Sequence, residues 1–238
     1  MTKITKFLSV TALLLTSWAT PVCAEEAFVE DPTPTETSEH KLMNNIDQDG
    51  LDYMQTDEYK ANMAKKEMEV ALQGRTAHLS TQLTFNWRTQ ETSYWCVPAC
   101  SQILIEKVTG RLYSQSDLAS RMGSSPSHGT YVNRAAPVIK QLTGANYEYT
   151  SNQASYFLPN VKTDIANGYP VIYFVDAGYF YNGYTVGTGH AVLGVGYQDN
   201  LVSFYDPNPV SQFNDIWQIS APDMSTALNA NDGGYYIW

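Results

Sequence analysis

The spacing of hydrophobic residues changes along the chain from a helical to a strand-like pattern. From about residue 80, apolar residues first recur every three or four positions, which is typical of amphipathic helices. The expected helices are 97–109, 114–122, 131–142 and 161–167. Further on, β-rich runs separated by Gly, Asn and Asp predict strands at 170–175, 190–197, 201–205 and 235–238. Helices followed by a largely antiparallel sheet indicate an α+β fold.

Local signals define the ends of these helices. Pro98 falls in the first turn of helix 97–109, where proline is tolerated, and Gly110 is a typical C-terminal stop. Ser114 is the expected N-cap of the next helix, with Asp117 three residues later. Pro137 is expected to bend or interrupt helix 131–142, because proline lacks a backbone N–H.

Residues 52–73 predict one more amphipathic helix, with Gly74 as its stop. This helix is either part of a propeptide or an integral first helix of the fold. Residues 45–50 resemble the first half of a calcium-binding loop, but the twelfth position, which requires a bidentate acid, holds Thr56. We therefore expect an Asp/Gly turn that caps the following helix.

The first residues have the features of an export signal. Lys3 and Lys6 precede an apolar run, and Pro21 and Ala24 follow it, so residues 1–24 are predicted to be a secretory signal peptide. Residues 25–41 are acidic and rich in Pro and Thr, which is typical of a disordered spacer. The predicted organisation is therefore a signal at 1–24, a spacer with an amphipathic helix at 25–80, and a globular domain at 81–238. The protein is expected to be secreted, to the cell envelope or beyond.

The charge of the chain excludes some partners. The formal net charge is −10, and removal of the signal, which carries two lysines and no acid, makes it −12. Such a chain is not expected to bind nucleic acid. No segment after residue 24 is apolar enough to span a bilayer, so we predict no stable membrane insertion once the signal is removed. The sequence leaves the oligomeric state open.

Only Cys96 and Cys100 remain after signal removal, and they point to chemistry more than to a disulfide framework. A bond between them would close a very small loop and add little stability. The histidines are scattered without a close ligand pair, so no metal or other cofactor is predicted. Cys100 lies one turn after Cys96 on the apolar face and is expected to pack in the core.

Cys96 is the candidate nucleophile. A cysteine at a helix N-terminus meets unpaired backbone N–H groups and the positive end of the helix dipole, and both favour the thiolate. The same N–H groups can bind an oxyanion, and Gln90, six residues earlier, could supply a second donor. The alternative for Cys96 is a buried structural thiol.

A thiolate nucleophile needs an acid/base group and a residue that orients it. His190 opens strand 190–197 beside small residues and is the candidate base; His128, in a loop, is its competitor. If strands 190–197 and 201–206 form a hairpin, Asp206 lies beside His190 and can orient the imidazole. Asn208 is the alternative orienting residue.

These features resemble a known family. Gln90, Trp95-Cys96, Gly129-Thr130, Gly168-Tyr169-Pro170-Val171, Gly189-His190 and Asp206-Pro207 are together similar to the papain-like peptidases related to the double-glycine leader peptidases of bacteriocin exporters. The similarity runs from about residue 85 to the C-terminus. It implies a papain-like cysteine peptidase fold, a bacterial source, a peptide or protein substrate, and Cys96, His190, Asp206 and Gln90 as catalytic residues.

The sequence departs from that family at Val97, where many leader peptidases have glycine. Many of those peptidases are also fused to a transporter, whereas this chain is expected to be exported alone. Two other functions use or retain the same fold. An acyl transferase or a cell-wall peptide amidase would employ the same centre, and a catalytically silent binding module would keep the fold without turnover.

Overall fold

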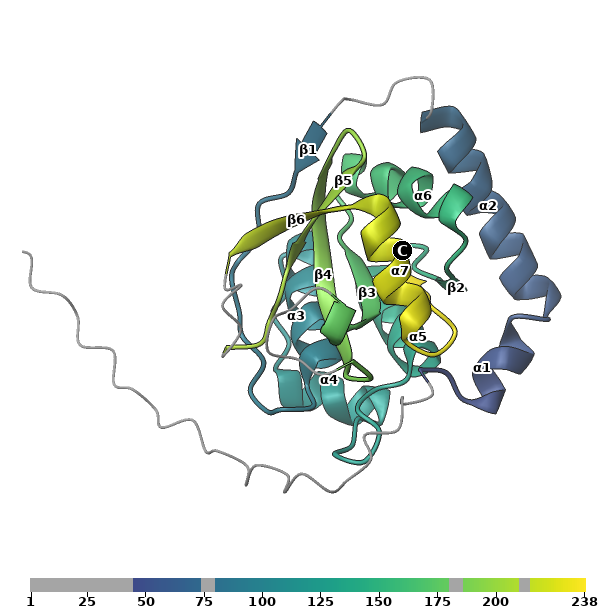
Figure 1. Ribbon diagram of the computed structural model, residues 1–238. Coiled ribbons are helices and arrows are strands. Elements are labelled where there is room, and N and C mark those ends of the chain that lie inside the picture. Colours follow the sequence, from purple (N-terminus) through teal and green to yellow (C-terminus); the bar gives the residue numbers. More distant parts are fainter. Residues whose placement is uncertain (1–44, 74–79, 180–185, 210–214) are drawn as a thin grey trace, which may run out of the picture. The chain divides into compact units, whose positions relative to one another are not determined.

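The protein is described from a computed structural model that covers residues 45–73, 80–179, 186–209 and 215–238 (Figure 1). The predicted signal peptide and the predicted spacer at 25–41 lie outside these residues, as do Gly74 and the histidines at 40 and 78. The helices are α1 (Gln48–Tyr53), α2 (Asp57–Gln73), α3 (Cys96–Thr109), α4 (Gln115–Met122), α5 (Val132–Thr143), α6 (Ala154–Ala166) and α7 (Ala221–Ala230), with a short 3₁₀ turn at Ala177–Tyr179. The strands are β1 (Ser80–Gln82), β2 (Tyr149–Ser151), β3 (Val171–Asp176), β4 (Gly189–Gln198), β5 (Leu201–Tyr205), β6 (Ile216–Ser220) and β7 (Tyr235–Ile237).

All strands join one antiparallel sheet, in the order β2-β7-β3-β4-β5-β6, with β1 paired to the end of β4. Strands β4 and β5 form the predicted hairpin, with Gln198 opposite Leu201. On the other side of β4, His190 lies opposite Val175 of β3. The α+β prediction is confirmed, because the first helices precede a sheet that is antiparallel throughout its described pairs.

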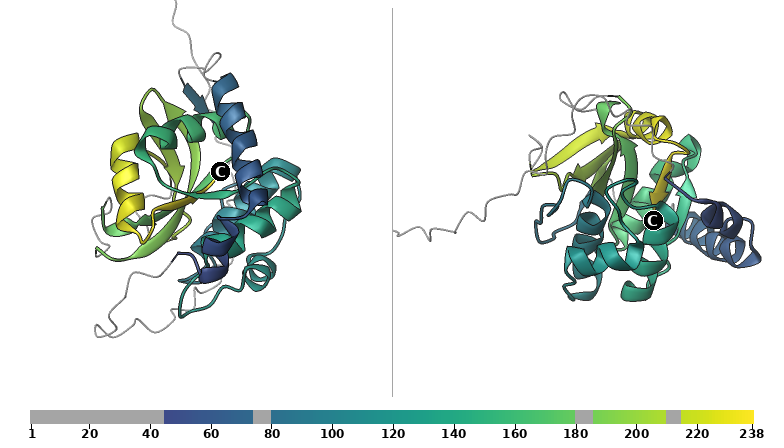
Figure 2. Two further views of the ribbon diagram at one scale, coloured as in Figure 1. Left: turned by 90° about the vertical axis from the view of Figure 1, so that its right-hand side faces the viewer. Right: turned by 90° about the horizontal axis from the view of Figure 1, so that it is seen from below.

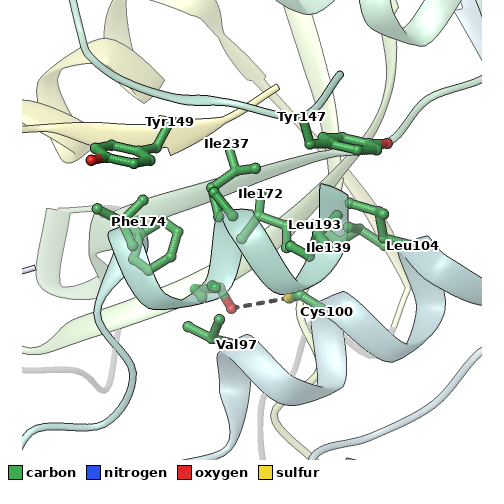
Figure 3. Close-up of a cluster of buried hydrophobic side chains, with 14 of the residues drawn as sticks. Val97, Cys100, Leu104, Ile139, Tyr147, Tyr149, Ile172, Phe174, Leu193 and Ile237 are labelled. Carbon is green, nitrogen blue, oxygen red and sulfur yellow. Dashed lines mark hydrogen bonds between the residues drawn. The ribbon is translucent and has the colours of Figure 1, made fainter. Parts of the chain in front are cut away.

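Helices cover both faces of the sheet (Figure 2). Helices α3, α4 and α5 enclose one core with the side chains of one sheet face, and Figure 3 shows Val97, Cys100 and Leu104 of α3 against Ile172, Phe174 and Leu193 of that face. Helices α6 and α7 enclose a second core with the alternate residues of the same strands, such as Tyr173, Val175 and Val192. Strand residues alternate between the two faces, so both faces are apolar and both are covered.

The helix-end predictions hold for α3 and α4. Helix α3 begins at Cys96 and ends before Gly110, which adopts a left-handed φ of 71° that glycine tolerates best. The Ser114 side chain accepts a hydrogen bond from the Asp117 N–H and caps α4. The C-terminus of α3 and the N-terminus of α4 are therefore set by local sequence, and α3 begins at the residue that carries the candidate thiol.

Three helix predictions need correction. The predicted helix 52–73 is two helices, α1 and α2, because the Thr56 hydroxyl accepts the Tyr59 N–H and starts a new helix. Helix α6 begins seven residues before the predicted start at 161, since Phe157 extends the buried stripe of Val161 and Ile165 by one turn. Helix α5 continues through Pro137, so the predicted interruption is wrong, while a bend stays a prediction; burial of the apolar face of the helix outweighs the lost hydrogen bond.

Strands β1, β2 and β6 and helix α7 were not predicted. The first three are three to five residues long and lie in polar or mixed sequence, so they carry no clear periodicity. Helix α7 did have a signal, because Ser220 accepts the Asp223 N–H and Pro222 lies in the first turn.

The α1–α2 segment packs against the rest of the described chain. The calcium-like turn caps α1, since the Asp47 side chain accepts the Gly50 N–H. Farther on, the buried Lys66 ammonium lies 3.4 Å from the Asp164 carboxylate of α6 and 4.2 Å from the Trp238 ring centroid. The Tyr59 hydroxyl donates to the Tyr149 carbonyl oxygen of β2. Whether residues 25–80 are removed as a propeptide stays a prediction.

Candidate active site

The thiol of Cys96 lies at the first residue of α3, partly exposed to solvent. The preceding Trp95 is the N-cap residue but makes no side-chain cap bond, so no capping side chain occupies the N–H groups of the first turn. Val97 and the following residues are buried and anchor the helix in the core. This arrangement presents a thiol and backbone donors together at one exposed helix end.

His190 and Asp206 meet at the start of the β4–β5 hairpin. Antiparallel pairing brings the first residues of β4 close to the residue that follows β5, as the sequence analysis expected. The His190 Nε2 and Asp206 Oδ1 atoms are 2.7 Å apart, and both side chains are buried. An interaction with Cys96 also acts on His190 and raises the pKa of its imidazole. Because Nε2 faces Asp206, Nδ1 is the ring nitrogen left for Cys96.

Opposing effects act on the pKa of His190. Burial disfavours the imidazolium and lowers the pKa, while the charge and hydrogen bond of Asp206, and then Cys96, raise it. The raising effects dominate, so the pKa of His190 lies well above its usual value of 6.5. The site therefore favours a protonated imidazole beside the Cys96 sulfur. Such a group can deliver a proton to a leaving amine.

Of the two candidates for the orienting residue, Asp206 and Asn208, it is Asp206 that contacts the His190 imidazole at 2.7 Å. The backbone N–H of Asn208 donates to Asp206 Oδ1 at 2.9 Å and so helps to fix the carboxylate. This contact was not predicted. The Asp-Pro-Asn sequence, which favours a turn that folds back on the aspartate, is the signal that could have indicated it.

Gln90 is buried next to this centre but holds the loop that leads to Cys96. Its Nε2 atom donates to the carbonyl oxygens of Thr92 and Ser93, at 3.0 and 3.2 Å, and its backbone N–H donates to the Pro207 carbonyl oxygen. Both hydrogens of the amide are thus engaged within the loop. For Gln90 to donate to an oxyanion, one of these two bonds has to open.

The remaining cysteine and histidine candidates lie elsewhere. Cys100 is fully buried, with a free thiol 3.6 Å from the Ala191 carbonyl oxygen, which confirms the predicted core position (Figure 3). Cys96 is also a free thiol. His128 stacks on the Tyr131 ring at a centroid distance of 4.6 Å, and it is His190 whose pKa is raised by Cys96.

Two kinds of feature are missing from the described ranges. No group of three or more His, Cys, Asp or Glu side chains among them is arranged to hold a metal ion. Within the same residues, every helix is too short or too polar to cross a membrane.

We expect the Asp206→Asn substitution to shift the pH dependence of thiol alkylation. Losing the carboxylate removes the main effect that raises the pKa of His190, so the imidazole loses its proton at lower pH. The pH–rate profile for alkylation of Cys96 by an epoxide should then have its alkaline limb at lower pH in Asp206→Asn than in the unaltered protein. A profile with an unmoved alkaline limb would contradict this role of Asp206.

The raised pKa of His190 also makes the free energy of unfolding depend on pH, and stability should fall in the alkaline range. A folded-state pKa above 6.5 means that the stabilisation from the His190–Asp206 pair is complete below pH 6.5 and is lost as the pH rises through the folded-state value. Urea unfolding of the unaltered protein and of Asp206→Asn, compared between pH 6 and the alkaline range, checks this.

Comparisons with known proteins agree with the fold and the sequence pattern. Residues 82–225 match the model of the Peptidase_C39 like family. A solved structure described as a C39-like peptidase from Bacillus anthracis is 12% identical, with a TM-score of 0.52 over 66% of this chain and 96% of that chain. The peptidase domain of Streptococcus ComA, a bifunctional ABC transporter, is 19% identical, with a TM-score of 0.45 over 65% and 97% of the two chains. A Carica candamarcensis cysteine protease is 14% identical, with a TM-score of 0.47 over 68% and 97%.

No curated protein matches the chain. The family model nevertheless covers more than half of the 238 residues. This protein therefore belongs to the Peptidase_C39 like family and is a cysteine peptidase.

Proposed function

We propose that this protein is an exported bacterial peptidase that hydrolyses peptide bonds with Cys96 as nucleophile, His190 as acid and base, and Asp206 as the orienting residue. The observation that supports this most directly is the 2.7 Å contact between His190 and Asp206, together with the raised pKa of His190, to which Cys96 contributes. Nothing else in the described chain combines a helix-terminal thiol with a charged imidazole.

The proposed reaction proceeds in two steps. The Cys96 sulfur attacks the carbonyl carbon of the scissile amide, and the negative oxygen is bound by the N–H groups at the start of α3. The C–N bond then breaks as His190 gives its proton to the departing nitrogen, which leaves a thioester on Cys96. Water attacks the thioester while His190 takes a proton from it, and the C–S bond breaks to release the acid product and restore the Cys96 thiolate beside protonated His190.

Gln90 is proposed as the second oxyanion donor. Its amide nitrogen makes two bonds to the 92–93 carbonyl oxygens, so substrate binding has to replace one of them. We therefore expect Gln90→Ala to have two effects, a lower rate of the chemical step and a loosened loop before Cys96.

The export proposal rests on the pattern of residues 1–24. N-terminal sequencing of the protein recovered from outside expressing bacteria should find a chain that begins near residue 25. A chain that stays in the cytoplasm with an intact N-terminus would contradict export.

The centre is tested by labelling with an epoxide inhibitor of thiol proteases, mapped by mass spectrometry. We expect rapid modification of Cys96, no modification of the buried Cys100, and at least a tenfold slower reaction in His190→Ala, which lacks the charged partner of the sulfur. Equal labelling with and without His190 would contradict the pair. Absent labelling of reduced protein would favour a silent binding module.

A transferase or a cell-wall amidase would pass the same labelling test because it would use the same centre. Product analysis separates these activities. Hydrolysis yields a free acid whether or not amines are added, whereas transfer yields an amide to the added amine. Cell-wall peptides and general protein substrates, tested side by side, distinguish an amidase from a general peptidase.

A further inference from the structure

An open groove lies beside the proposed centre, between the segment before Gln90 and the end of β5. It has a volume of about 500 Å³. The lining side chains come from the 87–91 segment, α3, α4 and β5, and those used below are Trp87, Arg88, Glu91 and Tyr205. None of them takes part in the proposed reaction.

One wall of this groove is aromatic and rigid. The Trp87 ring is half exposed, stacks on Phe85 at a centroid distance of 5.4 Å, and meets Tyr205 edge to face at 5.1 Å. The Tyr205 hydroxyl donates to the Arg88 carbonyl oxygen and holds the wall against β5. An indole held in this way presents a face to solvent, and tryptophan is the side chain that attracts cations most strongly through its ring.

The charges around the groove leave one carboxylate uncompensated. The Arg88 guanidinium makes two 2.9 Å hydrogen bonds to the Glu106 carboxylate, so these two charges cancel. Glu91 is exposed, and no ion pair within the described ranges involves its carboxylate, although its backbone N–H donates to Gln115. The charges of Arg88 and Glu91 balance within the lining, and Glu106 behind Arg88 adds one negative charge, so Glu91 is left without a cationic partner among these groups.

The groove is close to the reacting groups along the chain. Glu91 follows Gln90, Tyr205 precedes Asp206, and the Gln90 N–H is bonded to the Pro207 carbonyl oxygen. The groove lining and the proposed reacting groups are therefore supplied by neighbouring residues of the same two segments.

We propose that this groove binds a lysine or arginine side chain of the substrate. The proposal rests on the proposed function and names its substrate class, cationic peptides. The aliphatic stem of the side chain would lie on the Trp87 face and the charged end near Glu91. The negative charge of the protein would also draw cationic peptides toward it.

The test measures binding without catalysis. In ¹⁵N-labelled Cys96→Ala protein, the indole N–H signal of Trp87 is assigned by its loss in Trp87→Phe. Short peptides that differ only by lysine, norleucine or glutamate at one position are then titrated. We expect lysine to bind about three- to fivefold more tightly than norleucine, and glutamate most weakly, with the Trp87 signal shifting.

Matched variants distinguish binding of the lysine side chain in the groove from general attraction of cationic peptides by the negative charge of the protein. Glu91→Gln should remove most of the preference for lysine over norleucine, and 0.5 M salt should weaken it, whereas Glu67→Gln on the exposed face of α2 should leave it unchanged. Equal affinities for lysine and norleucine, or equal effects of the Glu91 and Glu67 substitutions, would overturn the proposal. Epoxide labelling of the unaltered protein reports on the Cys96 centre separately, so loss of one result does not imply loss of the other.

Discussion

Replacing Cys96 with alanine is expected to lower peptide turnover by about 10⁴-fold or more, because removal of a nucleophile leaves only binding and oxyanion contributions. The side chain is partly exposed at a helix end, so the free energy of unfolding should change by no more than about 1 kcal/mol. Turnover of a fluorogenic peptide mixture and urea unfolding of both proteins measure these two effects.

Cys100→Ala is the matched control for this substitution. It also removes a cysteine sulfur from α3, but one turn further along the helix and from a fully buried position in the core. It should cost roughly 1 kcal/mol of stability through the small cavity it leaves and should retain most of the turnover. Comparable turnover in Cys96→Ala and in the unaltered protein would eliminate Cys96 as the nucleophile.

The second large effect is expected from Lys66→Met, which should lower the free energy of unfolding by about 3–5 kcal/mol because it leaves a buried carboxylate unpaired. Lys66 and Asp164 are both almost fully buried, and the Lys66 ammonium also lies over the Trp238 ring. Burial raises the pKa of Asp164, and Lys66 partly counteracts this rise. Chemical unfolding of the two proteins measures the difference.

The loss in Lys66→Met should depend on pH. Without Lys66, the folded-state pKa of Asp164 rises further, so the carboxyl is protonated more easily and the penalty shrinks as the pH falls. The double variant Lys66→Met/Asp164→Asn should recover most of the stability at neutral pH. Lys65→Met, at an exposed position of the same helix, should change it by no more than about 0.5 kcal/mol. Equal effects of the two lysine substitutions would contradict this account.

The Lys66 result also bears on the propeptide question. If the α1–α2 segment contributes several kcal/mol, a chain that starts near residue 80 should be unstable, and these helices belong to the working enzyme. If that shorter chain instead folds and is more active than the longer one, residues 25–80 are a removable inhibitory segment. Circular dichroism and epoxide labelling of the two chains distinguish these outcomes.

Local sequence determined a large part of the fold. Ser114 and Gly110 define helix ends through contacts with residues only a few positions away, and the structure places both ends as predicted. The apolar runs of β3, β4 and β5 were equally clear, because strands buried on both faces need continuous hydrophobic sequence. The pairing of β4 with β5 followed from their short connection.

Other elements depended on contacts that are distant in the sequence. Strand β1 gains its partner only where β4 passes beside it, and the early turn of α6 forms because Phe157 reaches the second core. Such packing outweighs local conformational preference. A strand of three to five residues is also too short to show a hydrophobic periodicity in the sequence.

For the candidate site, sequence alone determined which groups could do chemistry: a cysteine at a helix start, a histidine at a strand start and an aspartate after the next strand. The tertiary structure decided how they meet, with a 2.7 Å contact between His190 and Asp206 and with the Gln90 amide turned to the loop carbonyl oxygens. The physical reason is range. Caps, stops and strand patterns act over a few residues, whereas side-chain distances, burial and the pKa of His190 depend on segments about a hundred residues apart that only folding brings together.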